Sequence, residues 1–437
     1  MPYINYIDLI YDTVRLDTAQ ALGFARMKRH PAIQEHEERP PMTTRADTAP
    51  KPAANIAASP TGDPWLLTPG PLTTSPTVKQ AMLHDYGSRD GRFIAINRRL
   101  RERLVSIAGG GETHVCVPLQ GSGTFVVEAM IGTFVPADGK LLILINGAYG
   151  RRIARICDYI GRAYATQETP EDVPVDPSAL DQALAADASI THVAVIHCET
   201  TSGILNPLRE VAEVTARHGR ALLIDAMSVF GAVPLDAKAI RFDAAVASSN
   251  KCLEGSPGMG FCIARTEALQ TAKGNAPSLS LDLHDQWAAM EANGQWRFTP
   301  PTHCILALDQ ALDEFDAEGG VAGRGGRYRD NCDILVSGLR AMGFRTLLPD
   351  ALQAPIIVTV HMPADPRFEF ETFYNRLSDA GYLIYPGKLT VADSFRIGCI
   401  GRLGSEQMHG VLAAIRDVLA EMGVHECGPV TAGKPQP

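Results

Sequence analysis

The feature that most constrains the fold is a series of short apolar segments that alternate with amphipathic ones. The apolar segments are LLILI, HVAVIHC, ALLIDA, AAVASS and GFCIA, at 141–145, 192–198, 221–226, 244–249 and 260–264. They are largely continuous in apolar character, which is typical of strands buried on both faces of a sheet. Segments between them, such as 177–187 and 208–219, repeat apolar residues every three or four positions and predict crossover helices. We therefore expect an α/β protein with a mostly parallel central sheet.

A second, smaller group of elements follows near the C-terminus. A Gly-rich segment at 318–326 is expected to interrupt the chain before a helix at 327–343. Further strands are expected at 355–360, 381–386 and 394–398. The pattern predicts a large domain at 65–318 and a smaller C-terminal α/β domain at 319–426, with a tail at 427–437.

Residues 1–64 differ from the rest of the chain. From Glu35 the composition is rich in Pro, Ala and Thr and has almost no large apolar side chains, so burial cannot offset the entropy lost on ordering. We expect residues 1–64 to form a flexible leader. Met42 lies within it and is a candidate for the true start of the protein.

Composition excludes several classes of protein. The chain has 437 residues with 49 acidic and 40 basic side chains, and its net charge of −9 argues against a general nucleic-acid binder. No apolar run approaches the roughly 18 residues of a membrane span, and the acidic N-terminus does not resemble a secretory signal. Nine separate cysteines without a CxxC pair suit a reducing compartment, so a cytoplasmic location is expected. The 12 histidines show no metal-binding spacing, and no metal is expected.

The segment QGSGTFVVEAM at 120–130 combines a strand end, a Gly-rich turn and a helix beginning near Thr124. Free N–H groups at a helix N-terminus can hold an anion such as a phosphate. A tight turn without a ligand is the alternative interpretation. The segment matches neither a Walker loop nor the dinucleotide fingerprint, because Val126 replaces the third glycine.

Two charged residues follow buried strands. Asp225 ends the strand of ALLIDA, at the sheet edge where α/β proteins bind ligands, although a helix cap or a buried ion pair is an equal alternative. Lys251 follows the strand of AAVASS, and a lysine at such a position is unusual because ammonium groups are nearly always solvated or paired. A phosphate cradle, a carboxylate and a lysine together are the protein groups that a pyridoxal phosphate enzyme needs.

The order and spacing of these groups resemble the fold-type I, class V aminotransferases over about residues 65–420. The similar segments are LLTPGPLTTS, LQGSGTFVVEA, NGAYGRR, HCETTSGILNP, DAMSVFG, SSNKCLEGSPG, SLSLDLHDQW, WRFTPPTH, GYLIYPGK and FRIGCIG. The resemblance implies pyridoxal 5'-phosphate as cofactor and a homodimer with shared active sites. It implies ping-pong transamination from 2-aminoethylphosphonate to pyruvate in phosphonate catabolism.

The resemblance also implies roles for individual residues. Lys251 would form the Schiff base and move the proton, and Asp225 would bond the pyridine nitrogen. The residues implied to bind the cofactor besides these are Ser122, Gly123, Thr124, Tyr149, Thr200, Asn250 and Thr299, the last reaching the phosphate of the neighbouring subunit's cofactor.

Substrate binding is implied for two arginines. Arg396, in FRIGCIG, would grip the substrate carboxylate with its planar guanidinium, and Arg89, in DYGSRD, is a candidate for a second cation. One departure is that Ala276 and Pro277 precede SLSLD, where the family usually carries an arginine. If that arginine contacts phosphonate, the departure affects substrate choice.

Other interpretations stay open at this point. Another class V aminotransferase, of the alanine:glyoxylate or serine:pyruvate type, would use the same machinery. A cysteine desulfurase would need a nucleophilic cysteine on a mobile loop, whereas Cys332 and Cys399 are expected in a helix and a strand as small buried side chains. A transcription regulator with an aminotransferase-like domain would need a DNA-binding module, and residues 1–40 show no helix-turn-helix pattern.

Overall fold

The computed structural model describes residues 58–387, 389 and 392–429. Most of the expected leader, including Met42, lies outside these residues, as does most of the expected tail at 427–437. The predictions about those two segments therefore stay predictions.

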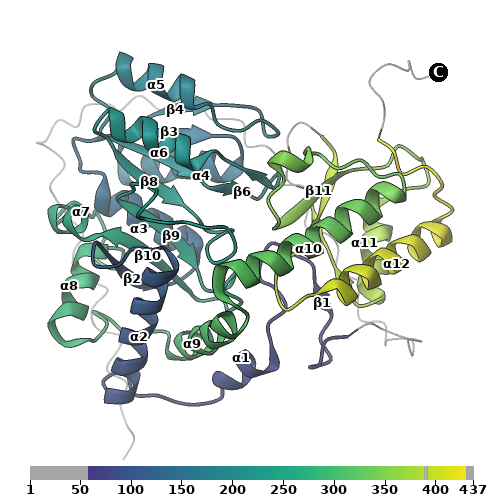
Figure 1. The fold of residues 1–437 in the computed structure, drawn as a ribbon, viewed down its shortest axis with the longest axis horizontal. Helices are drawn as coiled ribbons and strands as arrows, with labels where there is room; N and C mark the ends of the chain where they lie inside the picture. Colours follow the sequence, from purple (N-terminus) through teal and green to yellow (C-terminus); the bar gives the residue numbers. More distant parts are fainter. Residues whose placement is uncertain (1–57, 388, 390–391, 430–437) are drawn as a thin grey trace, which may run out of the picture. The chain divides into compact units, whose positions relative to one another are not determined.

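A seven-stranded sheet with the order β2-β10-β9-β8-β5-β3-β4 forms the centre of the larger part of the described chain (Figure 1). Only β10 runs antiparallel to its neighbours, and the other adjacent strands are parallel. The strands are β2 His114–Gln120, β3 Lys140–Ile145, β4 Ala163–Glu168, β5 His192–Ile196, β8 Ala221–Asp225, β9 Ala244–Ser248 and β10 Met259–Arg265. The expectation of an α/β fold with a mostly parallel sheet is confirmed.

Helices cover both faces of this sheet, which explains why its strands are continuously apolar. In β3, Leu142 and Leu144 belong to one core cluster and Leu141, Ile143 and Ile145 to another, because successive side chains point to opposite faces. The first cluster includes residues of α2 Gly91–Ile107, α5 Pro177–Ala186, α6 Leu208–Arg217 and α9 Thr302–Ala317. The second includes residues of α3 Gly123–Phe134, α4 Ala148–Ile160, α7 Thr266–Thr271 and α8 Leu283–Asn293.

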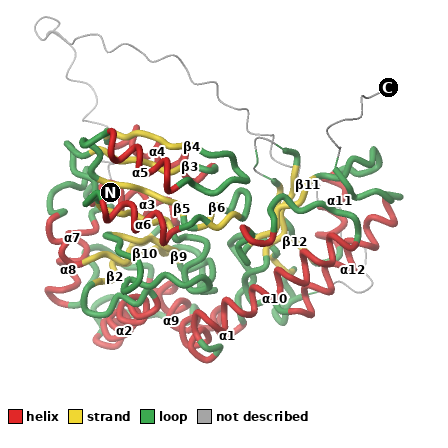
Figure 2. Tube along the Cα trace, turned by 45° about the horizontal axis from the view of Figure 1, so that its top comes forward, coloured by secondary structure: helices red, strands yellow, loops and turns green. Residues whose placement is uncertain are grey.

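The C-terminal elements surround a third cluster, formed by Leu67 and by residues between Cys332 and Cys427. Its antiparallel sheet has the order β11-β14-β13, and the long helices α10 and α12 run alongside it (Figure 2). These elements are α10 Gly320–Ala341, β11 Ile357–His361, α11 Phe370–Asp379, β13 Tyr385–Pro386, β14 Ser394–Gly398 and α12 Ser405–Met422, with a short 3-10 helix at Asp350–Leu352.

Short pairs of strands connect distant parts of the chain. β1 Trp65–Leu66 pairs in parallel with β12 Tyr382–Leu383, and β6 Cys198–Glu199 pairs with β7 Ile204–Leu205. The helix α1 Pro76–Ala81 follows the loop after β1 and packs against α9. Residues 67–73 therefore leave the C-terminal core and run toward the large sheet.

The Gly-rich segment does not interrupt the chain as expected, because α10 begins at Gly320 and not at residue 327. Gly319, at the N-cap, has φ +98°, a conformation that side chains disfavour. A Cβ atom at Gly325 would lie 2.2 Å from the carbonyl oxygen of Ala232, so this turn of the helix needs a glycine for close packing. The expected boundary between domains at 318 and 319 stays a prediction.

All nine cysteines lie in the described part of the chain and are free, and only Cys304 is not fully buried. Cys332 lies in α10 as expected, whereas Cys399 directly follows β14 and does not lie within it. Both thiols are buried, in contrast to a nucleophile on a mobile loop.

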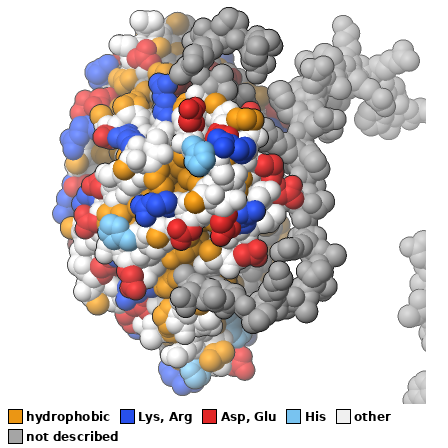
Figure 3. Space-filling view, turned by 90° about the vertical axis from the view of Figure 1, so that its right-hand side faces the viewer, with side chains coloured by type: hydrophobic (Ala, Val, Ile, Leu, Met, Phe, Trp, Pro, Cys, Tyr) orange, Lys and Arg blue, Asp and Glu red, His pale blue; other side chains and the backbone are white. Residues whose placement is uncertain are grey.

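The described surface carries both signs of charge. On the face drawn in Figure 3, basic and acidic side chains are interspersed with small apolar groups, and neither sign gathers on its own. No helix in residues 58–429, apart from the few not described, has the length and apolarity to cross a bilayer.

Candidate active site

Asp225 is the last residue of β8 and is 5% exposed. Its Oδ1 accepts a hydrogen bond of 2.9 Å from the backbone N–H of Met227. Burial raises the pKa of Asp225 to about 6, although the hydrogen bond from Met227 and the charges of Arg152 and Lys251 oppose that change. A cationic N–H donor at this carboxylate would stabilise its charged form.

Lys251 lies three residues beyond the end of β9, the strand next to β8. Its Nζ donates a hydrogen bond of 2.8 Å to the carbonyl oxygen of Pro69, in the loop after β1. Because parallel strands place their carboxyl ends at one edge, Asp225 and Lys251 lie at the same side of the sheet, as the sequence predicts.

The turn before α3 provides the expected N–H groups. Ser122 occupies the N-cap, and its side chain makes no capping hydrogen bond. Gly121 has φ +115°, and a Cβ atom there would lie 2.7 Å from the ring of Phe125. The first turn of α3 therefore presents backbone donors with the positive end of the helix dipole, which suits a phosphate.

A cavity of about 240 Å³ joins these three features. A second space of about 30 Å³ shares Tyr149, Asp225, Met227 and Lys251 with it and also reaches Thr200. The larger cavity is lined by Gly70, Ser122, Gly123, Thr124, Val127, Tyr149, Arg152, Asp225, Met227, Ser248, Asn250 and Lys251. The structure thus brings together eight of the sequence-predicted cofactor residues, from Ser122 to Lys251, around adjoining spaces.

Arg152 is a site residue that the sequence reasoning missed. Its guanidinium lies 4.7 Å from the ring centroid of Tyr149, and its Nη1 donates a hydrogen bond of 3.2 Å to Thr124 Oγ1. The spacing between Tyr149 and Arg152 could have identified Arg152. Residues three positions apart on a helix share a face, and Tyr149 lies in the first turn of α4. Arg152 places a positive charge beside the N-terminus of α3.

Glu199 is a second residue that was missed. Its buried carboxylate accepts hydrogen bonds from the backbone N–H of Tyr149 at 3.2 Å and from the hydroxyl of Thr201 at 2.7 Å. Burial raises the pKa of Glu199. The carboxylate joins the start of α4 to the turn that contains Thr200, so it positions two cofactor candidates. A glutamate in a buried apolar strand is unusual, and this sequence feature could have identified Glu199 as a candidate.

Arg396 lies on β14 and is 1% exposed. Its Nη1 donates a hydrogen bond of 2.7 Å to the carbonyl oxygen of Thr200, and its Nε and Nη2 donate to the carbonyl oxygen of Pro386. Burial lowers the pKa of this guanidinium from its usual value. Arg396 lies 5.1 Å from the ring centroid of Tyr385, so its planar group is held on several sides.

Arg396 does not line either of the two spaces, and neither do three other sequence features. Arg89 and Thr299 are exposed, and neither lines the cavities. Pro277 packs near Gly132, where an added Cβ would lie 3.1 Å from its ring, and Ala276 precedes it. Neither Ala276 nor Pro277 lines the described cavities.

Asp282, His284 and Asp285 at the start of α8 have ligand atoms within 4.8 Å of one another. Asp282 accepts from the backbone N–H of Asp285 as the helix cap, and Asp285 pairs with Arg297 at 3.1 Å. These contacts account for the cluster without a metal.

Comparison with known proteins defines the class of protein. A model of the class-V aminotransferase family matches residues 153–375. The arrangement of Asp225, Lys251 and the N-terminus of α3 around one cavity agrees with this match. The chain belongs to the class-V aminotransferase family.

Curated relatives that carry one and the same name are similar to most of this chain. The 2-aminoethylphosphonate–pyruvate transaminase of Pseudomonas fluorescens strain Pf-5 is 56% identical over 362 residues, which cover 83% of this chain and 98% of that protein. A 2-aminoethylphosphonate–pyruvate transaminase of Burkholderia lata is also 56% identical, over 83% of this chain and 96% of that protein.

Solved structures with lower identity support the fold. An alanine–glyoxylate aminotransferase from Nostoc sp. aligns with a TM-score of 0.77 at 24% identity, over 85% of this chain and 98% of that one. A pyridoxamine-pyruvate aminotransferase from Mesorhizobium loti aligns with a TM-score of 0.76 at 24% identity, over 84% and 94% of the two chains.

Class V aminotransferases depend on pyridoxal phosphate, and the residues present fit this group. The buried Asp225 has a raised pKa that an N–H donor would lower. Ser248, which lines the cavity, has a buried hydroxyl without a hydrogen-bond partner among the described residues. The uncapped N-terminus of α3 matches a phosphate.

Proposed function

We propose that the protein is a transaminase that moves the amine of 2-aminoethylphosphonate to pyruvate, giving phosphonoacetaldehyde and L-alanine in phosphonate catabolism. The observation that carries this proposal is the placement of Lys251, Asp225 and the N-terminus of α3 around one cavity. The names of the relatives at 56% identity support the choice of substrates.

The proposal assigns the cofactor's phosphate to Ser122, Gly123 and Thr124, with Asn250 nearby, and its ring to Tyr149 and Thr200. Pyridoxal phosphate, when bound, supplies a ring that withdraws electrons from the carbon bearing the amine. Asp225 would accept the N–H of that ring, and the charge of the ring would return the carboxylate to its ionised form. Arg152 adds a positive charge beside Thr124.

Lys251 is proposed to hold the cofactor and to act as the base. Its Nζ would take the proton from the carbon bearing the amine and return a proton at the other end of the transfer. The carbonyl oxygen of Pro69 accepts from Nζ at 2.8 Å, so this contact orients the lone pair and the remaining protons of the amine. The same group would serve both half-reactions in turn.

Arg396 is proposed to bind the carboxylate of pyruvate and the phosphonate of the amine donor. Its contacts to Thr200 and Pro386 are with neutral carbonyl oxygens, so an anion is the stronger partner for the guanidinium. In a chain of net charge −9, such local cations are needed to attract anionic substrates. Arg89 stays a weaker candidate for the second cation because it is exposed.

The homodimer is also a proposal. The described surface exposes three large apolar side chains that a partner subunit would bury. They are Phe125, Leu279 and Phe298, which are 51%, 71% and 45% exposed. Thr299 follows Phe298 and is proposed to reach the cofactor phosphate of the partner. Light scattering should give twice the chain mass, and a monomer with full activity would contradict the shared site. The cytoplasmic location stays a prediction.

A donor panel tests the proposed function. Purified enzyme loaded with cofactor should form alanine from pyruvate fastest with 2-aminoethylphosphonate. Alanine or serine with glyoxylate tests the alternative class V activities. The proposal fails if either of these pairs is turned over much faster than 2-aminoethylphosphonate with pyruvate.

A further inference from the structure

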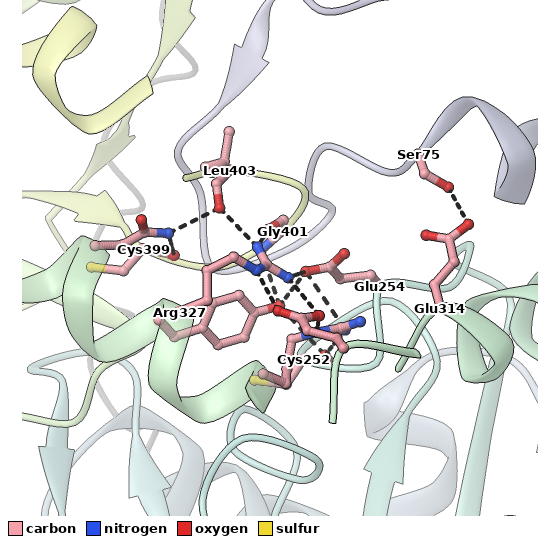
Figure 4. A network of polar contacts seen from close by, with 12 residues as sticks. Ser75, Cys252, Glu254, Glu314, Arg327, Cys399, Gly401 and Leu403 are labelled. Carbon is pink, nitrogen blue, oxygen red and sulfur yellow. Dashed lines mark hydrogen bonds and ion pairs between the residues drawn. The ribbon is translucent and has the colours of Figure 1, made fainter. Parts of the chain in front are cut away.

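A buried polar network joins Cys252 and Glu254, which follow Lys251, to the loop of Gly401 and Leu403 after the strand of Arg396 (Figure 4). Arg327, on α10, lies at its centre. Its Nη2 donates a hydrogen bond of 2.7 Å to Glu254 Oε1, and its Nη1 donates to the carbonyl oxygens of Gly401 at 2.6 Å and Leu403 at 2.8 Å. One guanidinium therefore contacts both loops.

On the Lys251 side, the network holds an unusual turn. Glu254 is 1% exposed, and its φ of +60° is disfavoured for a residue with a side chain. Its backbone N–H donates to the carbonyl oxygen of Lys251 at 2.8 Å. Tyr328 donates its hydroxyl to the same Oε1 that Arg327 contacts, at 2.6 Å. Glu254 keeps this conformation because surrounding groups hold its carboxylate.

Arg324 strengthens the same side. It is fully buried, and its Nη1 donates to the carbonyl oxygen of Cys252, the residue after Lys251, at 2.7 Å. Glu318 balances the charges, since its two oxygens accept from Arg324 Nε and Arg327 Nε, each at 2.6 Å. Cys252 and Glu254, which follow Lys251 in the turn, are thus fixed to α10.

On the Arg396 side, the contacts lie just beyond β14. Asn331, one helical turn after Arg327, donates through Nδ2 to the carbonyl oxygens of Cys399 at 3.0 Å and Leu403 at 3.1 Å. The backbone N–H of Gly401 donates to the hydroxyl of Tyr328 at 3.3 Å. Cys399 is three residues after Arg396, so α10 also fixes the end of its strand.

Arg327 is suited to this role by its chemistry. It satisfies acceptors in Glu254, Glu318, Gly401 and Leu403 with one planar, rigid fork. A lysine has a single nitrogen and cannot reach acceptors on both loops in the same geometry. None of these groups lines either cavity of the site, and the guanidinium of Arg327 already donates to acceptors on both loops.

We propose that Arg327 is a positioning residue that sets the place of Lys251 relative to Arg396. This inference rests on the roles proposed for those two side chains. Without Arg327, the contacts of Arg324 and Tyr328 would still hold the turn of Lys251. The loop after Arg396 would lose its contacts at Gly401 and Leu403, so the carboxylate-binding guanidinium would be misplaced. Misplacement by about 1 Å can cost about a hundredfold in rate.

The test uses an enzyme loaded with pyridoxamine phosphate and mixed with pyruvate in a single turnover, followed by the cofactor's visible absorption. No amine donor is present, so the result does not depend on 2-aminoethylphosphonate being the substrate. Arg327→Met should raise the pyruvate concentration for half-maximal rate by about tenfold or more. The affinity for pyridoxal phosphate should change by less than about twofold, because the phosphate and ring residues are not in the network.

Arg329→Met is the matched control, because Arg329 is exposed on the same helix, and it should behave as wild type. The proposal is overturned if Arg327→Met lowers only thermal stability or the fraction of loaded enzyme, with an unchanged pyruvate dependence for each loaded site. If Arg327→Met does not fold, Arg327→Lys decides. A raised half-maximal concentration supports the proposal, and a wild-type value contradicts it.

Discussion

The ε-amino group of Lys251 donates a hydrogen bond of 2.8 Å to the carbonyl oxygen of Pro69, which lies 182 positions earlier in the chain. The next residue, Gly70, has φ +116°, and a Cβ atom there would lie 2.8 Å from Lys251 Nζ. The loop that connects β1 to α1 thus forms one wall of the active site, far from Lys251 in sequence.

Gly70→Ala should impair the enzyme through this wall. The added methyl group would overlap Lys251 Nζ and approach the carbonyl oxygen of Asn250 to 3.0 Å. We expect kcat to fall about tenfold or more, because Lys251 would be displaced. Gly91→Ala is the control, since no other atom lies within 4 Å of a Cβ at that position. Equal kcat values for both variants would show that the wall is not needed.

Asp225→Asn should stabilise the apoenzyme at neutral pH. The pKa of Asp225 rises from 3.8 to about 6 on folding, chiefly through burial, so the folded state binds more protons between these values. The wild type therefore loses stability relative to Asp225→Asn as the pH rises from about 4 through 6. A shift of this size corresponds to about 3 kcal/mol above pH 6. Unfolding of both apoproteins by denaturant across this pH range checks the sign.

Asp187→Asn is a control of opposite sign. The hydrogen bond from Lys140 lowers the pKa of the half-buried Asp187 to about 2, so its contribution to stability is present above pH 3.8 and is lost as the pH falls through 2. The contribution is small at the surface. If Asp225→Asn and Asp187→Asn showed the same pH dependence, the explanation by burial of Asp225 would be wrong.

Arg396→Lys should weaken pyruvate binding while the cofactor still binds. Lysine keeps the charge but loses the fork that contacts Thr200 and Pro386. We expect KM for pyruvate to rise about 30-fold or more, which corresponds to about 2 kcal/mol. Arg402→Lys, at an exposed position on the following loop, should leave KM unchanged. An unchanged KM in Arg396→Lys would remove Arg396 from the substrate site.

Arg152→Gln should weaken cofactor binding. The substitution removes the charge beside Thr124 and the contact of the guanidinium with the ring of Tyr149. Loss of a positive charge beside the proposed phosphate site should raise the Kd for pyridoxal phosphate about tenfold. Arg155→Gln changes an exposed residue of the same helix and should not. Fluorescence titration of the apoproteins measures both values, and equal Kd values would contradict a role for Arg152.

The sequence was sufficient to predict the parts of the site that depend on strand ends. Buried strands are recognisable from continuous apolar runs, and parallel strands place Asp225 and Lys251 at one edge. The turn at Gly121 could also be predicted, since a glycine before a helix N-terminus indicates a local backbone conformation.

Other parts depend on contacts between distant segments and could not be predicted. The network of Arg324, Arg327 and Glu254 joins a helix to two loops, and each residue alone resembles a surface charge in the sequence. The predicted start of α10 was wrong because the glycines at 319 and 325 were interpreted as a break before the helix. Gly325 instead lies within the helix and packs against the backbone of Ala232. Close packing of this kind leaves no periodic pattern.

The most direct test of the central claim is alanine formation from 2-aminoethylphosphonate and pyruvate by Lys251→Ala, measured beside the wild type. The wild type should be yellow, lose its colour with borohydride and form alanine. Lys251→Ala should lack both the colour and alanine formation, while Lys238→Ala, which changes an exposed lysine, should retain them. Full turnover by Lys251→Ala would contradict the account.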